Sequence, residues 1–551
     1  MLMVAIGCTP GDAEVSIDLC LAGSQANALS AFVASADFFG VRMTVEGPGF
    51  VKVETLITEQ PLPTTINTPP FSVGDDRVIT LEYLTQDLIV RFRGRTSAFD
   101  VAEGKSATTT MVLSDMTTPL LLSTGDTQIR TPTTVGHTAA LKTDDSGEVV
   151  LFGGGLPLAN VPGSGQIATY QSFVQDAAKN CQAISLLTAT LAQPRLFHAT
   201  VVLGSGSFFV YGGADQATNG SVLSFPETFD RNWARQTDNS LPAEDARSFP
   251  LLISLPLNRA LSIGGNDNAN AAATQHRVFL FDANDPLLTD ASYVSSRCQT
   301  ITQGTACEIG NGTAGIPSGP TGHFLASGVG FVAGGGASFF LLDPDDLKED
   351  QPFQTLSGIT TPPTFSHASA LLSPGDDGRD RILVVGGFDG TNTAQDTIRL
   401  IVTDGTAANT EEILFCGAKL GVARTAPSAT ALYDGSALIC GGANGGTVYD
   451  SCELVVVDSD NTQLRVYSND TNERCLPVMA QSKFFPTATL LPDNTILLVG
   501  STSFTDAPNA QTHIERFNPP LALDMEILAG VQTECAPAEF EPPNPGPDCP
   551  P

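Results

Sequence analysis

The chain has 551 residues, of which 42% are hydrophobic and 16% charged, and its 27 basic and 59 acidic side chains give a formal net charge of -32. This hydrophobic share suffices for a packed core and excludes wholesale disorder, while the length allows several domains or one large repeat fold. So acidic a chain is a poor partner for nucleic acid or an anionic membrane surface, and no apolar run approaches the roughly 18 residues of a transmembrane helix.

Residues 1–20 are predicted to hold a truncated signal segment and a linker. Residues 4–8 read VAIGC, which resembles the lipobox of bacterial lipoproteins, and the resemblance implies that Cys8 carries lipid. The alternative is an ordinary apolar N-terminus. A lipid anchor would be the one route to a membrane, and it predicts an extracytoplasmic location as an outer-membrane or cell-surface lipoprotein; secretion is the alternative.

The chain contains 11 cysteines, and none shows the C-x-x-C spacing of a zinc or redox site. If Cys8 is lipidated, an even number remains. Three pairs lie close in sequence and are candidate disulfide partners, which would suit an oxidising compartment: Cys298 with Cys307, Cys440 with Cys452, and Cys535 with Cys549. Geometry, and not spacing, decides whether they are bridged. The alternative is a set of unrelated buried thiols.

Residues 21–118 are predicted to form a β-sandwich of immunoglobulin-like or transthyretin-like shape. Apolar residues alternate at Val41, Met43 and Val45, and again at Val90 and Phe92, as in half-buried strands. A short helix is expected within residues 21–37.

A repeat fills residues 119–530. Each copy has a short apolar run, a tight turn and a second apolar run that ends in a glycine doublet, which indicates a β-hairpin. The seven copies end at Gly154, Gly213, Gly265, Gly335, Gly387, Gly442 and, in a degenerate form, Ser501. A third apolar segment follows each doublet, and four antiparallel strands in roughly 50 residues are typical of a propeller blade. The doublet suits this fold because a residue without Cβ permits close approach of strands and a sharp exit.

The doublets after apolar runs resemble the kelch repeat family, except that this chain has one tryptophan, Trp233, where kelch repeats usually carry one in each unit. The resemblance implies a seven-bladed kelch-like β-propeller, a fold that serves both binding modules and enzymes. Leu120–Leu122 and Leu521–Leu528 are rival candidates for the outer strand of the last blade. Residues 531–551 are predicted to be a Pro-rich tail in extended or disordered form.

Four histidines are assigned to one repeat position, the start of the first strand: His137, His198, His323 and His367. Pro250, Pro427 and Pro486 hold that position in other copies. The histidines are interpreted as structural residues that hydrogen-bond the next blade, because structural residues follow repeat symmetry; the alternative is a metal site.

A basic residue stands three residues before that position in four copies: Arg195, Arg247, Arg424 and Lys483. Because the first strand starts where the second ends, these bases and the loops after the doublets should share one face. One hypothesis is a cationic ring that attracts anionic ligands. The alternative is that each base pairs with a carboxylate or a carbonyl and holds blades together.

No cofactor is predicted. The acidic stretches that begin at Asp343 and Asp376 are candidate Ca²⁺ sites but are better read as solvated turns. The blades, and residues 514–520, also resemble galactose oxidase, but no Tyr-His pair for its copper occurs, and sialidase boxes are absent. The leading function is a non-enzymatic binding module of the bacterial cell envelope that recognises a protein or a glycan through the propeller face. The alternatives are a propeller enzyme acting on a carbohydrate or small alcohol, and a purely structural or adhesive surface protein.

Overall fold

The structure is a computed structural model, which describes residues 12–13, 15–20, 24–49, 51–58, 65–68, 71–102, 107–118, 120–122, 136–143, 148–154, 166–171, 183–215, 221–223, 226–237, 247–265, 276–282, 298–301, 304–312, 319–334, 339–344, 354–356, 359, 366–389, 393–469, 475–501 and 513–542. Within these ranges the chain is mostly β-structure, with two α-helices, α1 (Ser24–Val33) and α2 (Ala522–Val531), and two 3-10 turns, η3 (Ala407–Asn409) and η4 (Thr533–Cys535).

The N-terminal region is built on one hydrogen-bonded sheet. Its strands, in spatial order, are β4 (Val53–Ile57), β3 (Phe38–Glu46), β7 (Gly74–Thr85), β8 (Val90–Arg95), β10 (Ala107–Asp115), β2 (Val15–Cys20) and β5 (Thr65–Asn67), with β9 (Phe99–Val101) on β7. β2 and β10 run parallel and the other pairs are antiparallel. A small separate pair joins β1 (Asp12–Ala13) to β6 (Phe71–Ser72).

This sheet encloses one apolar core. Val41, Ile79 and Phe92 are fully buried in it, and Leu29 of α1 packs against them. The alternation of apolar residues predicted these strands, and the expected short helix is confirmed as α1. The ordered region begins earlier than residue 21, because β2, which falls in the range expected to be a linker, is paired on both sides.

Seven further sheets of four or five strands follow within the described residues. The first two are β12 (Thr138–Leu141), β13 (Val149–Phe152), β14 (Gln166–Gln171), β15 (Ala183–Thr190); and β16 (Ala199–Val202), β17 (Phe208–Tyr211), β20 (Glu227–Phe229), β21 (Arg235–Thr237). The third and fourth are β22 (Leu251–Leu255), β23 (Arg259–Ile263), β24 (His276–Asp282), β26 (Gly304–Gly312), β25 (Cys298–Ile301); and β27 (Thr321–Phe324), β28 (Gly330–Ala333), β29 (Phe339–Leu342), β30 (Gln354–Thr355).

The fifth and sixth sheets are β31 (Ala368–Leu372), β32 (Asp380–Val385), β33 (Ile398–Thr403), β34 (Glu411–Ile413); and β35 (Ser428–Ala431), β36 (Ala437–Cys440), β39 (Cys452–Val457), β40 (Leu464–Tyr467), β44 (Ala538–Phe540). The seventh is β41 (Phe484–Leu490), β42 (Ile496–Ser501), β43 (His513–Phe517), β11 (Leu120–Leu122). Two short hairpins lie outside the sheets, β18 (Ala214–Asp215) with β19 (Ser221–Val222), and β37 (Ala443–Asn444) with β38 (Thr447–Val448).

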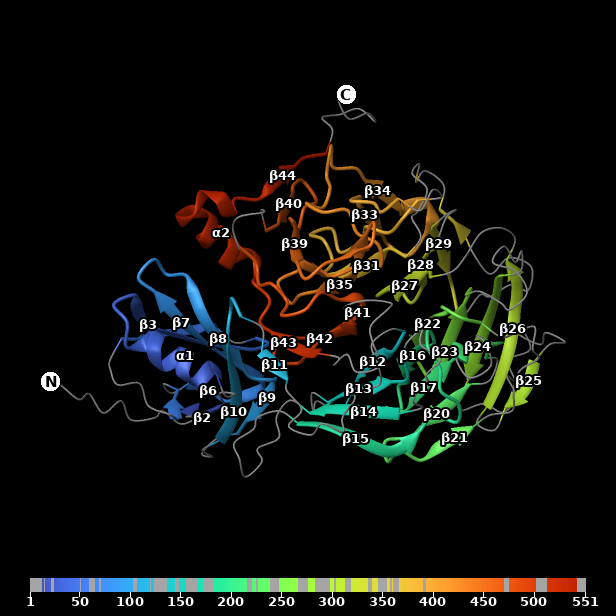
Figure 1. Cartoon of the computed structure of the whole chain (residues 1–551), viewed down its shortest axis with the longest axis horizontal. Helices are drawn as coiled ribbons and strands as arrows, with labels where there is room; N and C mark the ends of the chain where they lie inside the picture. Colours follow the sequence, from blue (N-terminus) through green and yellow to red (C-terminus); the bar gives the residue numbers. More distant parts are fainter. Residues whose placement is uncertain are drawn as a thin grey trace.

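The first strands of the seven sheets contact one another in a closed circuit, in the order β12, β16, β22, β27, β31, β35 and β41. Figure 1 shows them around a common centre, with the last strand of each sheet toward the rim, as in a β-propeller. Of the two candidates for the outer strand of the last sheet, Leu120–Leu122 takes this place, because it pairs with β43. The segment after Leu521 forms α2 instead.

Neighbouring sheets share their cores. Phe209 and Tyr211 of β17 pack against Phe281 of β24 in the next sheet, with ring centroids 4.7 and 5.2 Å apart. The second strands are therefore buried on both faces, which explains why they read as continuous apolar runs and not as alternating ones. A single small sheet of this kind cannot bury its apolar faces alone, so neighbouring sheets stabilise one another.

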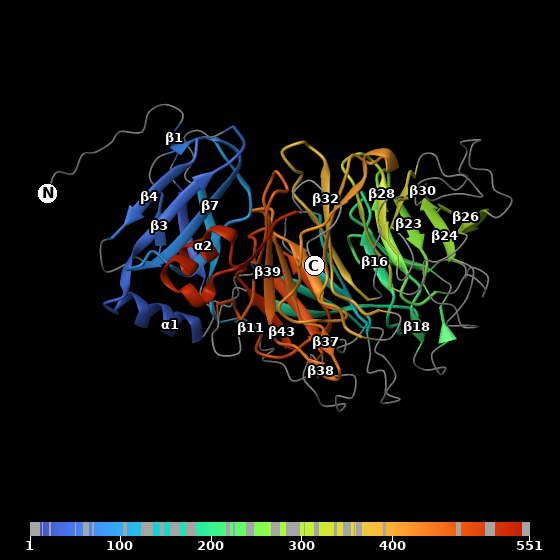
Figure 2. The same ribbon diagram turned by 90° about the horizontal axis from the view of Figure 1, so that it is seen from above.

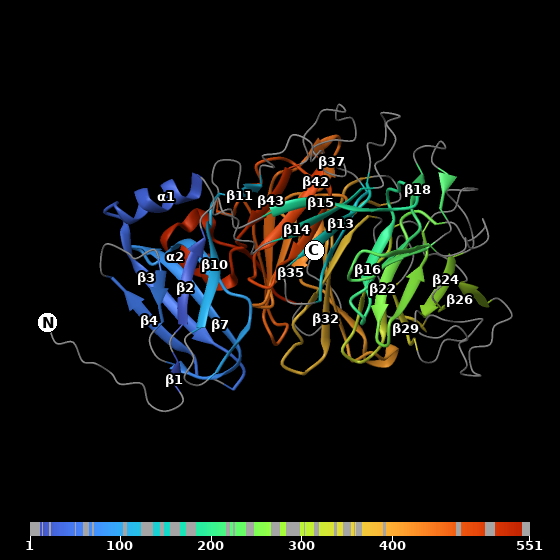
Figure 3. The same ribbon diagram turned by 90° about the horizontal axis from the view of Figure 1, so that it is seen from below.

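The C-terminal segment crosses back over the molecule. Asn518 donates to the carbonyl of Arg93 at 2.7 Å, Asp524 of α2 binds the Arg93 guanidinium at 2.6 Å, and β44 joins the sixth sheet beside β40. Figures 2 and 3 show α2 between the N-terminal sheet and the other sheets. Residues predicted to begin a Pro-rich tail thus include a paired strand.

Two disulfides join described cysteines. Cys440 and Cys452 are opposite each other on β36 and β39 and are bonded, as predicted. Cys535 bonds Cys475, which corrects the predicted partner Cys549; η4 carries Cys535 to the loop before β41, 60 residues earlier in sequence. Cys20 and Cys416 are disulfide-bonded as well. Disulfides indicate an oxidising, extracytoplasmic environment.

The structure describes only some of the other candidate cysteines. Cys298 and Cys307 face each other in the register of β25 and β26, while Cys8 and Cys549 lie outside the described residues. In the part of the chain that the structure describes, no helix has the length and hydropathy to cross a bilayer.

Candidate functional site

The inner strands begin at one end of the closed circuit, and a repeated residue pair precedes them there. The first member of each pair has a left-handed backbone, with φ between 46° and 73°: Gly136, Phe197, Phe249, Gly319, Ser366, Ala426 and Phe485. The second member is a histidine or a proline. Backbone bonds link neighbouring pairs, since Phe197 N donates to Gly136 O and Phe249 N donates to Phe197 O, both at 2.8 Å.

The glycine doublets build the same end of the molecule. In the register of each sheet, the residue after the histidine or proline faces the residue before the doublet, as Thr138 faces Phe152. The N–H of Gly442 donates to the carbonyl of Lys483 at 2.9 Å in the next sheet, and a Cβ on Gly441 would meet that carbonyl at 2.6 Å. Figure 2 shows the hairpins that follow two doublets, β18–β19 and β37–β38, on one side of the molecule. The predicted common face of doublet loops and strand starts is thereby confirmed, and we call it the axial face.

Three phenylalanines from the second, third and seventh sheets meet over the centre of this face. The rings of Phe197 and Phe249 are stacked with centroids 4.1 Å apart, and Phe485 lies 5.9 and 6.2 Å from them. All three are half-buried and have φ between 48° and 56°, a conformation unfavourable for a bulky side chain. Glycine, serine and alanine hold the other four positions, so the backbone does not demand a phenylalanine.

The three phenylalanines line a cavity of about 260 Å³, which we call the axial pocket. The described residues that line it include no carboxylate, lysine or arginine. Three buried histidines are among them, together with Pro250, Pro320, Pro427 and Pro486. Its polar groups are the Ser366, Thr321 and Thr487 hydroxyls and the histidines. Such a surface favours a neutral ring or apolar group over an ion.

The predicted structural role of the histidines is confirmed. Each ring nitrogen Nε2 is hydrogen-bonded to a hydroxyl on the neighbouring inner strand: His137 to Thr487 at 2.8 Å, His198 to Thr138 at 2.9 Å, His367 to Thr321 at 2.9 Å, and His323 to Ser369 at 2.8 Å. Burial, with the charge of Lys483, lowers the pKa of His137 to about 4. Burial, with the charge of Arg195, lowers the pKa of His198 well below its usual value. Within the described residues no group of three metal-ligating side chains is present.

One histidine was assigned to the wrong repeat position. Thr321 faces Ala333 as Ala368 faces Val385, so Pro320 is the equivalent of His367. His323 is the third residue of β27. Pro317, and not a base, stands three residues before Pro320, so this copy lacks the marker of the register, and the apolar pattern alone does not fix it.

The exposed position predicted for the four basic residues is corrected. Arg195, Arg247, Arg424 and Lys483 are at most 2% exposed and lie behind the axial face. Three of them are ion-paired within their own sheet: Arg195 with Glu227 at 2.5 Å, Arg424 with Glu453 at 2.6 Å, and Lys483 with Glu515 at 2.9 Å. Burying a charge is costly unless a partner is present, and here the third strand supplies one. Arg195, Arg424 and Lys483 therefore join strands of their own sheets, and their pairing with a carboxylate is what the alternative interpretation expected.

Sequence reasoning missed the residues that matter most here. Glu227, Glu453 and Glu515 each stand early in the third strand, and each also accepts backbone N–H bonds from the loop that carries its base. The aromatic residues had a signal that was overlooked, because Phe197, Phe249 and Phe485 lie two residues after a base and directly before a histidine or proline.

The candidate calcium stretch at Asp376 forms the turn between β31 and β32. Asp377 accepts bonds from the Arg379 backbone and side chain, at 3.0 and 2.6 Å. Gly378 N donates to Gly375 O within the same turn. Of the other stretch, only Asp343 and Pro344 lie within the described residues.

No family model and no curated protein sequence matches this chain. Among solved structures, it is similar to a fungal alcohol oxidase of the AA5 family in complex with copper, with 14% identity, a TM-score of 0.48 and coverage of 74% of this chain and 77% of that one. It is also similar to YjhT, with 11% identity, a TM-score of 0.39 and coverage of 70% and 94%. The strand pairing, and not these distant likenesses, defines the fold described above.

Proposed function

We propose that this protein is a non-enzymatic binding module of the bacterial cell envelope that recognises a protein or a glycan through the axial face. Its scaffold is a seven-bladed kelch-like β-propeller carrying an N-terminal β-sandwich. The seven sheets in chain order and the closed circuit of their first strands support the propeller. The single core shared by β2, β3, β7, β8 and β10 supports the sandwich.

The observation that carries the proposal is the group of three phenylalanines at the axial pocket. Phe197, Phe249 and Phe485 adopt a backbone conformation that costs on the order of 1 kcal/mol for each residue, although small residues serve at the equivalent positions. Half-buried aromatic rings around a cavity are a binding platform for sugar rings or for prolyl and aromatic side chains. The described lining offers no carboxylate, lysine or arginine, and the Nε2 atom of each of its three histidines is already hydrogen-bonded to a hydroxyl group. Recognition of a neutral group therefore fits better than acid–base chemistry.

The test is an array of neutral glycans and of peptides rich in proline and aromatic residues, followed by titration of each hit. The Phe197→Ala and Phe249→Ala double variant should weaken binding about tenfold or more. Ala426 holds the equivalent position in the sixth sheet, so alanine is compatible with this backbone. The control is Tyr433→Ala, which removes a half-exposed ring in the β35–β36 turn, at the opposite end of the strands.

An array without any hit, or a hit that the double variant binds as tightly as the wild type, would contradict a binding role for this face. The envelope location is tested separately. The sequence around Cys8 supports a lipid anchor, and Cys8→Ala should then move the protein from the membrane fraction to the soluble fraction of the native host. Unchanged fractionation would contradict the anchor without touching the axial pocket.

A further inference from the structure

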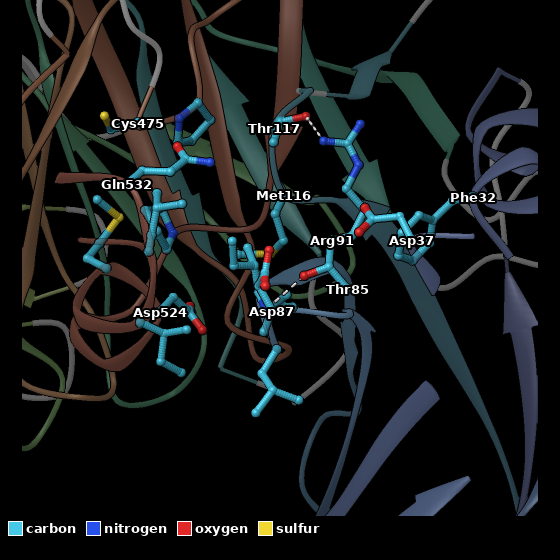
Figure 4. Close-up of a pocket in the computed structure, with 18 residues that line it drawn as sticks. Phe32, Asp37, Thr85, Asp87, Arg91, Met116, Thr117, Cys475, Asp524 and Gln532 are labelled. Carbon is cyan, nitrogen blue, oxygen red and sulfur yellow. Dashed lines mark hydrogen bonds between the residues drawn. The ribbon is translucent and has the colours of Figure 1, made fainter. Parts of the chain in front are cut away.

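A second cavity, of about 410 Å³, lies between the N-terminal sheet and α2. It shares no lining residue with the axial pocket. We call it the interdomain pocket. One wall is the β7–β8 turn, and the other is α2 with the loop around Cys475. Figure 4 shows side chains from both walls entering the space between them.

The two walls are held at a fixed separation by buried contacts. Arg93 of β8 binds Asp524 of α2 at 2.6 Å and Glu82 of β7 at 2.7 Å. Asn518 reaches Ser114 Oγ at 2.7 Å just before α2 begins. Because these bonds fix the walls, the pocket does not close by simple approach of α2. Its volume lies in the range of small-molecule sites.

The pocket has an apolar body with flexible side chains. Met116 and Met525 line it from opposite walls, together with Ile89 and Ile527. Methionine side chains adapt to ligands of varied shape, and this lining suits an aliphatic or aromatic body.

The charges at the pocket leave an excess of carboxylates. Arg91 is bound by Asp115 at 3.0 Å and donates to Thr117 at 2.8 Å, and Asp524 is bound by Arg93. Asp37 and Asp87 are exposed, and within the described residues neither carboxylate is ion-paired. The backbone bond from Gln86 N to Asp37 O, at 2.9 Å, places these two acids on adjacent segments. Figure 4 shows both on the side of the N-terminal sheet.

We propose that the interdomain pocket binds a small amphipathic amine, whose ammonium group pairs with Asp37 and Asp87 and whose apolar body lies between the methionines. An ammonium supplies the charge that the local excess of carboxylates lacks. An anion of the same size meets two carboxylates, and a neutral alcohol gains only the apolar contact. A ligand that touches both walls binds only the docked arrangement of the N-terminal sheet and α2, so it should also stabilise that arrangement.

The experiment is calorimetric titration of the full chain with hexylamine near neutral pH, with hexanoate and hexanol as probes of charge. Saturable binding of hexylamine is expected, with weaker binding of hexanol and none of hexanoate. The Asp37→Asn and Asp87→Asn double variant should bind hexylamine roughly tenfold more weakly. Asp75→Asn with Asp100→Asn is the matched control, because it makes the same change in net charge at exposed residues that do not line the pocket.

A second variant tests the cavity itself without altering charge. Ile527 is half-buried on α2, and Ile527→Trp should fill the space and abolish binding while thermal unfolding in the absence of amine stays close to that of the wild type. Equal hexylamine binding by the wild type and either pocket variant, or binding of hexanoate as tight as that of hexylamine, would overturn the proposal. Because Phe197 and Phe249 do not line this pocket, the result is independent of the function proposed for the axial face.

Discussion

At the scale of single residues, the buried bases do more than neutralise a charge. The Arg424 guanidinium donates to the carbonyl of Gly441 at 2.8 Å and to Glu453 at 2.6 Å within the sixth sheet. Its own carbonyl accepts the N–H of Gly387 from the fifth sheet at 2.9 Å. One side chain and its backbone therefore join two sheets. Arg195 repeats the arrangement with Gly212, Glu227 and Gly154.

The first prediction concerns these pairs. Glu453→Gln leaves the buried Arg424 charge without its carboxylate and should lower the free energy of unfolding by about 3–5 kcal/mol. Asp377→Asn, which neutralises the acid of the more exposed Arg379 pair, should cost less than about 1 kcal/mol. Urea denaturation of both variants measures the difference. Equal losses would show that the buried pair has no special weight.

The second prediction concerns acid stability. Burial lowers the pKa of His323 to about 4, against an ordinary value of 6.5. Between these values the unfolded chain binds the proton more readily, so this group makes stability fall as the pH drops from about 6.5 to 4, by at most about 1.4 kcal/mol per pH unit. His323→Gln should reduce the slope of unfolding free energy against pH by that amount in this window, measured by urea denaturation at several pH values. An unchanged slope would contradict the assignment.

The residues that the sequence revealed are those that obey the repeat. The base and the histidine or proline recur at a fixed spacing, so their shared position was visible. The partner Glu453 was not, because it lies 29 residues from Arg424 across a turn of variable length and is one of 59 acids. Whether a repeated charge faces solvent or a carboxylate depends on this long-range pairing, which no local pattern encodes.

At the scale of elements, the glycine doublet determines how each second strand leaves its sheet. Both glycines have positive φ in the doublets at 153–154, 212–213, 264–265, 386–387 and 441–442. The first glycine packs against the carbonyl of the following base, as Gly441 does against Lys483. The doublet thus serves both as a turn and as a contact between sheets. The apolar runs and turns correctly predicted the hairpins, but the register of β27 and the helix after Leu521 required the tertiary pairing.

The third prediction separates these two demands on glycine. Gly441→Ala places a Cβ at 2.6 Å from the Lys483 carbonyl oxygen and should lower the free energy of unfolding by about 3 kcal/mol. Gly445→Ala is the control, because its φ is also positive, at 55°, but no atom lies within 4 Å of the added Cβ. It should cost only about 1 kcal/mol. Comparable thermal shifts for the two variants would mean that backbone conformation alone is limiting.

At the scale of the whole molecule, the C-terminal segment unites regions that the sequence presents as separate. Arg93 links Glu82 of its own sheet to Asp524 of α2, and α2 is in turn tied to the other sheets where Ala522 N donates to Asp434 at 2.8 Å. The Cys475–Cys535 disulfide fixes the far end of the same segment. The N-terminal region and the seven sheets should therefore unfold together, although each has its own core.

The fourth prediction tests that coupling. Asp524→Asn removes the ion pair across the interface but leaves Glu82 beside Arg93, so the N-terminal region keeps its own buried pair. The variant should split one calorimetric transition into two, as the coupling weakens by about 3 kcal/mol. Arg42→Gln, which disrupts a pair with Glu82 inside the N-terminal sheet, should lower the stability of that sheet without separating the transitions to the same extent. If Asp524→Asn unfolds in one step like the wild type, the disulfide and Asn518 suffice to hold the two regions together, and the ion pair contributes stability but not coupling.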